Sequence, residues 1–442
     1  MLDVLRELLR EPTARGLAEA VSQAVGQGRL SAGAKLPPVR QVADALQVSP
    51  TTVGAAWQLL RRSGTIRTDG RRGTTIAETR TGGPGRYRAA LRSRTGFPLD
   101  LSTGVPDPQL LPPLPPLTGI FPVPGSYLDE PVHPELAVLL RERWPYEPER
   151  IGVFDGAMDA IDQIASALLR MGDRVVVERP SFPPLLDLLE AIGTRPVGVD
   201  TDAQGILPDR LAAALMERPV AVFLQPRALN PTGASWSKKR AAELALVLAR
   251  HPAVCVIEDD SAGDISMAPL YSIGASLPMQ TVHVSSFSKS HGPDLRLAAV
   301  GGPAAVLDPV LERRLLGQGW TSRLLQQLMA RLLTEPSSVA AVRNAREEYA
   351  RRRRCMVKAL SRAGFELPVG DGLNLWLPVA DEQAALLSLA GDGISAAAGA
   401  AFTVGPMPPH LRVTVGLVAE DHDLVASRLA RAATAPALRL AR

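Results

Sequence analysis

The sequence has few of the residues that metal sites, disulfide frameworks and membrane spans require. Only two cysteines and six histidines occur among 442 residues, and none has the spacing of a metal-ligand motif. We therefore assign no metal and interpret Cys255 and Cys355 as buried or incidental thiols. No apolar run approaches the roughly 18 residues of a membrane helix, and the charged N-terminus lacks a signal-peptide core. These absences predict a cytoplasmic protein that has no membrane partner.

Positive charge is unevenly distributed along the chain, whose net charge at pH 7 is +4. Residues 1–80 carry 12 Lys and Arg residues against 7 Asp and Glu, whereas the remainder carries 37 against 38. The whole excess of positive charge therefore lies in the first 80 residues. This asymmetry indicates an N-terminal module that binds nucleic acid, followed by an electrically balanced body.

The pattern of residues 36–64 is typical of two short helices joined by a tight turn. In LPPVRQVADALQV, Pro38 stands where a helix would begin, and apolar residues follow at helical spacing. Ser49 is a suitable N-cap for a second helix, which has Pro50 at its first position and extends to Gly64. Two such helices form a helix-turn-helix, whose second helix can enter the major groove of DNA.

The segment GTIRTDGRRGTTIAE, which follows, predicts a β-hairpin behind these two helices. Its two short β-prone runs flank a turn that carries Arg71 and Arg72. A basic hairpin in this place is the wing of a winged helix-turn-helix. The alternative is a small helical domain with an exposed arginine loop. It is disfavoured because the helix-turn-helix pattern, the hairpin and the charge asymmetry occur together.

Residues 12–78 resemble the GntR family of bacterial winged-helix regulators, on the stretch GRLSAGAKLPPVRQVADALQVSPTTVGAAWQLLRRSGTIRT and the wing. The resemblance implies contacts to double-stranded operator DNA by Arg40, by Thr51 and Thr52 on the second helix, and by the two wing arginines. Arginine contacts to phosphates would provide affinity, and base contacts would provide sequence choice. This chain has Pro50 where the family often has a basic or polar residue.

Residues 79–98 are rich in Gly, Arg and Thr and have no sustained periodicity, which predicts a linker between two domains. We therefore expect a winged helix-turn-helix domain at 1–78 and a second domain at 99–442. In the second domain the strand-like runs RVVVE, VAVFLQ, AVCVIED and TVHVSS alternate with helical segments. This alternation predicts an α/β fold with a mainly parallel sheet, whose ligands bind at the carboxyl ends of the strands.

Chemically distinctive residues lie where these strands end. VCVIEDD ends in acidic residues that include Asp259, and VHVSSFSK places Lys289 directly after a strand. Burial of this amine would lower its pKa and suit it to a Schiff base with an aldehyde. Asn230 lies in a turn fixed by Pro and Gly, and Gly156 begins a helix whose free N–H groups can hold a phosphate. These are the residue types that a pyridoxal-phosphate site uses.

Residues 99–430 resemble the fold-type I aminotransferases of class I and II. The resemblance implies that Lys289 forms a Schiff base with pyridoxal 5'-phosphate (PLP), that Asp259 contacts the pyridine nitrogen and that Asn230 contacts the ring hydroxyl. It also implies the other ligand contacts, which are Ser286, Arg296, Gly156 and Ala157 at the phosphate, Phe182 on the ring and, in PPHLRVTVG, Arg412 at an effector carboxylate. A bidentate guanidinium suits that last task.

The chain as a whole resembles the MocR subfamily of transcriptional regulators, in which a GntR-like reader precedes an aminotransferase-like body. The resemblance implies a homodimeric DNA-binding regulator that senses PLP or a small amino compound. Two alternatives stay open: an active aminotransferase with an appended DNA-binding domain, and a regulator whose degenerate pocket binds no PLP. The sequence does not indicate the operon, the operator, the effector or the direction of regulation.

Two departures from the aminotransferase pattern favour a sensor over an enzyme. Ser261 stands where the family usually has a tyrosine that contacts the ring hydroxyl. At the phosphate turn the family usually has Thr, Ser and Gln, whereas this chain has Phe154, Asp155 and Asp159. Two carboxylates beside a phosphate are unfavourable unless they point away or Arg296 offsets them. Further along, we interpret the basic run YARRRRC, residues 349–355, as a solvated helix face.

Overall fold

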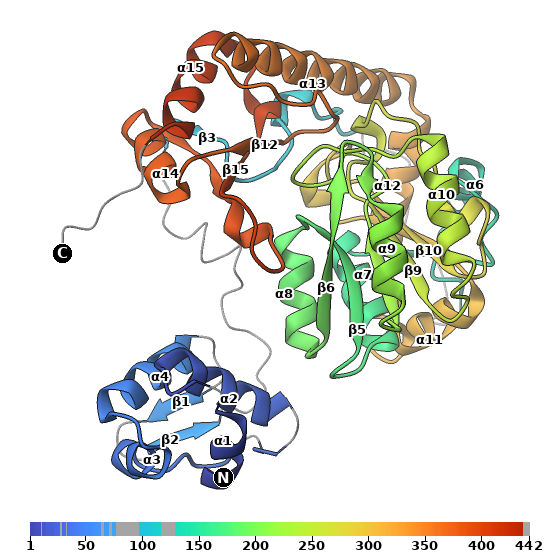
Figure 1. Ribbon diagram of the computed structural model, residues 1–442. Helices are drawn as coiled ribbons and strands as arrows, with labels where there is room; N and C mark the ends of the chain where they lie inside the picture. The colour runs from blue at the N-terminus through green and yellow to red at the C-terminus, as the bar shows by residue number, and fades with distance from the viewer. Residues whose placement is uncertain are drawn as a thin grey trace. The chain divides into compact units, whose positions relative to one another are not determined.

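The computed structural model describes residues 1–9, 11–26, 29–31, 33–62, 66–69, 73–76, 97–115 and 129–435. The chain divides into two compact units, Met1–Gly85 and Arg86–Arg442 (Figure 1). The division falls within the predicted linker, 79–98, of which only residues 97 and 98 are described. Every helix in the described part is too short or too polar to traverse a bilayer.

Helices and one hairpin surround a common core in the described part of the first unit. The helices are α1 (Leu2–Leu8), α2 (Ala14–Gly26), α3 (Val39–Leu46) and α4 (Pro50–Arg62), and the strands are β1 (Ile66–Asp69) and β2 (Gly73–Ile76). Buried Leu, Val and Ala side chains, together with Trp57, hold these elements together. The two strands pair antiparallel and form the hairpin expected for the wing. Arg71 and Arg72, between the strands, lie outside the described residues.

Helices α3 and α4 form the predicted helix-turn-helix. The turn begins at Gln47, whose φ of 55° is left-handed and redirects the chain after α3. The Ser49 side chain accepts a hydrogen bond from the N–H of Thr52 at 3.0 Å. It thereby satisfies one of the N–H groups that the first turn of a helix leaves unpaired. Pro50 follows as the first residue of α4, so both features expected from the sequence are present.

The larger part of the second unit is a sheet with the strand order β4-β11-β10-β9-β8-β5-β6-β7. Its strands are β4 (Arg150–Phe154), β5 (Arg174–Arg179), β6 (Arg195–Asp202), β7 (Gly205–Ile206), β8 (Ala221–Leu224), β9 (Cys255–Asp260), β10 (Thr281–Ser286) and β11 (Ala298–Gly302). The central strands β6, β5, β8, β9 and β10 run parallel, as the sequence predicted.

Helices cover both faces of this sheet (Figure 1). One face packs against α7 (Ala157–Leu168), α8 (Pro183–Ile192) and α11 (Ala304–Leu315), and the other against α9 (Pro208–Leu215) and α10 (Lys238–Leu248). Val175 and Val177 of β5 belong to the first core, and Val176 belongs to the second. Because successive side chains point to opposite faces and both faces are buried, the central strands are continuous apolar runs.

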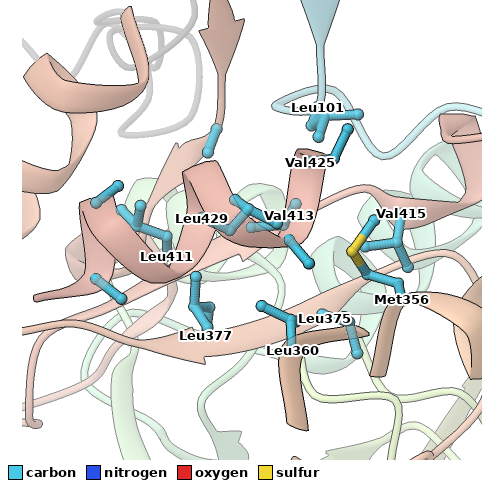
Figure 2. Close-up of a cluster of buried hydrophobic side chains, with 14 of the residues drawn as sticks. Leu101, Met356, Leu360, Leu375, Leu377, Leu411, Val413, Val415, Val425 and Leu429 are labelled. Atoms are coloured by element: carbon cyan, nitrogen blue, oxygen red, sulfur yellow. The ribbon is translucent and has the colours of Figure 1, made fainter. Parts of the chain in front are cut away.

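A second, smaller sheet lies against the long helix α13 (Pro336–Arg362). It consists of β12 (Leu375–Pro378), β15 (His410–Val413) and β14 (Ala397–Ala398) in that order. Leu377 and Leu411 from this sheet pack against Leu429 of the last helix (Figure 2). The remaining elements are β3 (Leu99–Asp100) paired with β13 (Ile394–Ser395), and the helices α6 (Pro134–Arg143), α12 (Arg323–Thr334), α14 (Glu382–Gly391) and α15 (His422–Ala433).

Only half of the arginine run of α13 is a solvated face, so that prediction was wrong for two of its four arginines, while Arg351 and Arg354 are exposed. Arg352 and Arg353 are only 4% and 1% exposed. Arg352 pairs with Asp107 Oδ2 at 2.7 Å. Arg353 donates to the carbonyl oxygens of Thr232, at 3.2 Å, and of Asn374. A guanidinium can be buried when carbonyl and carboxylate oxygens satisfy its N–H groups, and the local sequence does not reveal such distant partners.

Replacing Ser49 with alanine should loosen the start of α4, because the N–H of Thr52 would lose its acceptor. We expect Ser49→Ala to cost about 1 kcal/mol of local stability. The cost should appear as faster amide hydrogen exchange in the first turn of α4. Ser49→Asp keeps an acceptor and should exchange like the wild type. Equal exchange in the alanine variant and the wild type would contradict the capping role.

Candidate functional site

The carboxyl ends of three neighbouring strands carry the predicted cofactor residues. Asp259 of β9 lies opposite Val284 of β10 in the parallel pair, and Lys289 is the third residue after the end of β10. Strand β8, on the other side of β9, leads into the turn that contains Asn230. Because parallel strands end at the same edge of a sheet, these three side chains come from one edge.

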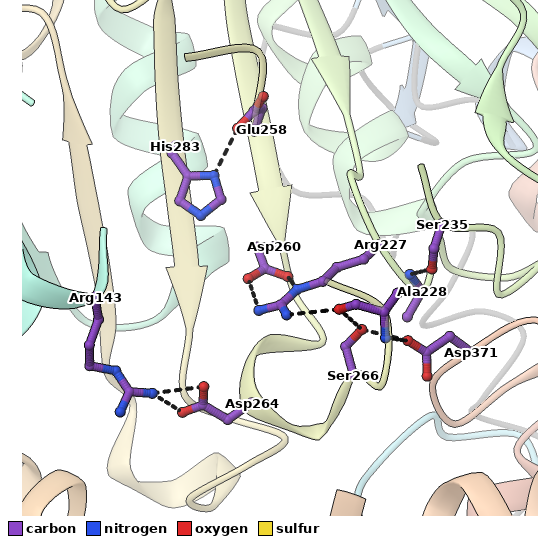
Figure 3. A network of polar contacts seen from close by, with 11 residues as sticks. Arg143, Arg227, Ala228, Ser235, Glu258, Asp260, Asp264, Ser266, His283 and Asp371 are labelled. Atoms are coloured by element: carbon purple, nitrogen blue, oxygen red, sulfur yellow. Dashed lines mark hydrogen bonds and ion pairs between the residues drawn. The ribbon is translucent and has the colours of Figure 1, made fainter. Parts of the chain in front are cut away.

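Strand alternation separates the three acidic residues of VCVIEDD. Glu258 is buried and accepts hydrogen bonds from Ser272 Oγ at 2.7 Å and from the Ile273 N–H at 2.6 Å. Asp260 is buried and forms a bidentate pair with Arg227 at 2.8 and 2.7 Å (Figure 3). Burial alone would raise the pKa of Asp260, but the paired Arg227 outweighs it and lowers that pKa. Asp259, between them, points to the opposite face of the strand.

Gln225 holds both Asp259 and the turn of Asn230. Asp259 is 6% exposed, and its Oδ2 accepts a hydrogen bond from Gln225 Nε2 at 2.7 Å. The Oε1 atom of the same Gln225 accepts from the N–H of Asn230 at 2.7 Å. Asp259 Oδ1 has no hydrogen-bond partner among the described residues. A buried carboxylate with one open oxygen suits a donor such as a protonated ring nitrogen.

The Lys289 amine lies in the same site and donates to Ser261 Oγ at 3.2 Å. Burial lowers the pKa of Lys289, the charge of Asp259 opposes this shift, and the charge of Arg412 adds to it. Burial likewise raises the pKa of Asp259, against the hydrogen bond from Gln225 and the charge of Lys289. A lowered pKa increases the fraction of neutral amine, which is the form that attacks aldehydes. Ser261, at the usual tyrosine position, is thus the partner of the amine.

The start of α7 and Arg296 lie together and make up the predicted anion site. Gly156 precedes the helix with a φ of 105°, and Ala157 is the first helical residue. Arg296 Nη2 donates to the carbonyl oxygen of Asp155 at 3.1 Å. The φ of 105° favours glycine, and a Cβ atom on Gly156 would also lie 2.7 Å from that nitrogen and displace the guanidinium. Free N–H groups at a helix start and an adjacent guanidinium together attract a phosphate. Ser286 ends β10 and is buried.

Phe182 and Arg412 occupy different parts of the second unit. Phe182 is half-buried, directly precedes α8 and packs against the core of the large sheet. Arg412 belongs to β15 of the small sheet and is 1% exposed. Its guanidinium lies 5.1 Å from the centre of the Phe402 ring and donates to the carbonyl oxygen of Ser102. Although Arg412 comes from the other sheet, its charge contributes to the lowered pKa of Lys289.

The described DNA-contact candidates lie at the starts of the two helices of the helix-turn-helix. Arg40 is exposed in the first turn of α3, and Thr51 is exposed in the first turn of α4. Thr52 is partly buried, and its Oγ1 lies 2.8 Å from Ser49 Oγ. Arg40 and Thr51 are therefore accessible to DNA, whereas the Thr52 hydroxyl takes part in the helix cap.

Two family models match the chain. The model of aminotransferase class I and II matches residues 123–429, which is more than half of the sequence. The chain belongs to the aminotransferase class I and II family. The model of bacterial regulatory proteins of the gntR family matches residues 13–76. A GntR domain ahead of a class I and II aminotransferase domain is the combination of the MocR subfamily, as the sequence predicted.

Individual relatives include both regulators and enzymes. The vitamin B6 salvage pathway transcriptional repressor PtsJ of Salmonella typhimurium is 38% identical over 410 residues, which are 91% of this chain and 94% of that protein. The aminotransferase tdiD of Emericella nidulans is 30% identical over 308 residues, 62% of this chain and 70% of that protein. The solved structure of LysN, an α-aminoadipate aminotransferase from Thermus thermophilus, superposes with a TM-score of 0.69 at 23% sequence identity. The superposition covers 85% of this chain and 97% of the LysN chain. The last match shows the fold.

Membership of the aminotransferase class I and II family implies PLP as the cofactor. The side chains of the described site fit PLP. The open Oδ1 atom of Asp259 offers an acceptor, and the lowered pKa of Lys289 offers a reactive amine. The start of α7 with Arg296 offers a place for a phosphate.

Sequence reasoning missed Gln225, which donates to Asp259, and Glu178, which accepts from the N–H of Gln225. The N–H of Gln225 donates to Glu178 Oε2 at 2.9 Å. Glu178 is the buried penultimate residue of β5, and burial raises its pKa to about 8, with a further contribution from the charge of Asp259. Both residues are polar and stand at the end of an apolar strand run, which is the signal that could have identified them.

Glu178 should make the second unit less stable as the pH rises. The pKa of Glu178 is raised from 4.5 to about 8, so the folded chain holds a proton that the unfolded chain releases. This contribution is fully present below pH 4.5 and is lost as the pH rises toward 8. The slope from one such group is at most about 1.4 kcal/mol per pH unit. Glu178→Gln stays neutral at every pH and should remove this pH dependence. Urea unfolding midpoints of the wild type and of Glu178→Gln, measured between pH 4.5 and 8, would show the difference. Parallel pH profiles would argue against a protonated Glu178.

Proposed function

We propose that the protein is a transcriptional regulator that binds PLP at Lys289 and changes its affinity for operator DNA with PLP occupancy. One observation carries this proposal: Gln225 holds a buried Asp259 with an open oxygen in the same site as a lysine of lowered pKa. The similarity to PtsJ, whose name describes a repressor of vitamin B6 salvage, supports PLP itself as the signal.

Each side chain of the site has a distinct task in this proposal. When bound, PLP supplies an aldehyde and an electron-withdrawing pyridine ring. The amine of Lys289, whose pKa is lowered by burial, is the group that would meet the aldehyde. Asp259 keeps a proton on the ring nitrogen through its open Oδ1. Asn230, fixed through its N–H by Gln225, serves the ring hydroxyl. The remaining contacts are those of Phe182 with the ring and of Ser286, Arg296, Gly156 and Ala157 with the phosphate.

A working aminotransferase is the second candidate. The retained Lys289, Asp259 and Arg412 favour it, since an amino compound with a carboxylate could enter beside the amine and bind the Arg412 guanidinium. Against it stands Ser261, which provides no phenol and whose hydroxyl accepts from Lys289 instead. We therefore assign the site to sensing, with such an amino compound as a further effector.

We further propose that the regulator acts in the cytoplasm as a homodimer. Two copies would present two helix-turn-helix units to a pseudo-palindromic operator, which is the usual match between protein symmetry and half-sites. The ligand can shift DNA affinity only if it binds two arrangements of the protein unequally.

Addition of PLP to the purified protein should produce a visible absorbance band that saturates with PLP. Lys289→Ala should lack this band, because no amine remains for the aldehyde. Ser288→Ala, one residue earlier in the chain, is the matched control and should keep it. Absence of the band from the wild-type protein would overturn PLP binding and leave a regulator with a different ligand.

Arg40 should contribute to operator affinity mainly through phosphate. In anisotropy titrations with an operator selected from random duplexes, Arg40→Ala should reduce the slope of log K against log salt by about one unit. Arg210→Ala, an exposed arginine of the second unit, should leave the slope unchanged. PLP should shift the operator affinity of the wild type but not that of Lys289→Ala. An unaltered salt slope in Arg40→Ala would remove this residue from the DNA interface.

A further inference from the structure

Two carboxylates flank the anion site at the start of α7. Asp155 directly precedes Gly156, and Asp159 lies in the first turn of the helix. Both are thus within one helical turn of the N–H groups that a phosphate would use. Negative charges so close to an anion oppose its binding. A site for a phosphorylated ligand therefore needs a cation that compensates them.

Arg314 of α11 pairs with both carboxylates. Its Nη1 lies 3.4 Å from Asp159 Oδ2, and its Nη2 lies 3.5 Å from Asp155 Oδ2. Arg314 is 5% exposed, whereas the side chains of Asp155 and Asp159 are 33% and 29% exposed, so water screens these attractions only in part. Nη2 also donates to Thr321 Oγ1 at 2.8 Å, and the guanidinium lies 4.4 Å from the centre of the Phe154 ring. The ring and the hydroxyl hold Arg314 in place independently of the two aspartates.

The two carboxylates have further donors outside the anion site. Asp159 accepts hydrogen bonds from the N–H of Asp155 at 3.1 Å and from Gln163 Nε2 at 2.8 Å. Asp155 accepts from the amide of Gln318. Among the described residues, Arg296 forms an ion pair with neither carboxylate and contacts only the carbonyl oxygen of Asp155 in this turn. The charge of Arg296 is thus available to a ligand.

We propose that Arg314 is a positioning residue that makes this site selective for phosphorylated ligands. With Arg314 in place, two guanidinium groups match two carboxylates, and the N–H groups at the start of α7 tip the balance toward an anion. Without Arg314, Arg296 would be the remaining guanidinium beside Asp155 and Asp159. Arg296 would then form an ion pair with one of these carboxylates in place of the phosphate. The inference rests on the proposed PLP binding and adds a determinant that the phosphate turn itself does not contain.

The test compares two ligands that differ only in the phosphate. Dissociation constants of full-length wild type and Arg314→Met are measured for PLP and for pyridoxal by absorbance titration, with inorganic phosphate as a competitor against PLP. We expect Arg314→Met to weaken PLP binding about tenfold or more, because the Arg314 guanidinium would no longer neutralise the carboxylates of Asp155 and Asp159 near the phosphate. Pyridoxal binding should change little, and inorganic phosphate should compete less well than it does in the wild type.

A charge rescue separates this role from a purely structural one. Adding Asp155→Asn and Asp159→Asn to Arg314→Met removes the uncovered charges and should restore most of the PLP affinity without altering pyridoxal binding. Equal losses for PLP and pyridoxal, without rescue, would show that Arg314 only holds α11 against the sheet. Wild-type protein that binds neither ligand would instead overturn the proposed function.

A second variant covers the case in which Arg314→Met does not fold. Asp155→Asn with Asp159→Asn in the presence of Arg314 leaves two guanidinium groups and no opposing carboxylate. This variant should bind PLP more tightly than the wild type and pyridoxal equally well. Unchanged PLP affinity in this folded variant would overturn the inference.

Discussion

The hydrogen bond from Gln225 to Asp259 is the contact on which the cofactor site depends. A buried carboxylate that keeps one oxygen open is costly unless the other oxygen has a fixed donor. Gln225 supplies that donor at 2.7 Å and ties the turn of Asn230 to the same point. Its own N–H is held by Glu178, so three neighbouring strands, β5, β8 and β9, support one carboxylate. The Gln225 side chain thus links the open carboxylate to backbone and side-chain groups of three neighbouring strands.

Compensation of buried charge by arginine recurs through the second unit. Arg227 neutralises Asp260, and Arg314 covers the two aspartates of the phosphate turn. Arg353 is buried against backbone carbonyl oxygens. Residues after position 80 also carry almost equal numbers of basic and acidic side chains, whereas the first 80 residues carry the excess of positive charge, which would suit a polyanion.

Local sequence signals sufficed for the elements and for the residues at strand ends. The N-cap at Ser49, the parallel strands and the place of Lys289 after β10 follow from periodicity, capping chemistry and the rule for parallel sheets. Gln225, Glu178 and Arg314 escaped because their roles come from partners distant in the chain, which only the tertiary fold brings together. The same reason explains why Arg352 and Arg353 of α13 are buried within a basic run predicted to be solvated, because their partners lie in other segments.

The origin of Lys289 and Arg412 in different sheets has a geometric consequence. The amine belongs to the large sheet and the guanidinium to the small one, yet their charges interact. Any molecule that engages both must bridge two separately packed cores. A molecule that meets Lys289 alone would contact a residue of the large sheet only, whereas one that also carries a carboxylate for Arg412 would contact both packing units at once.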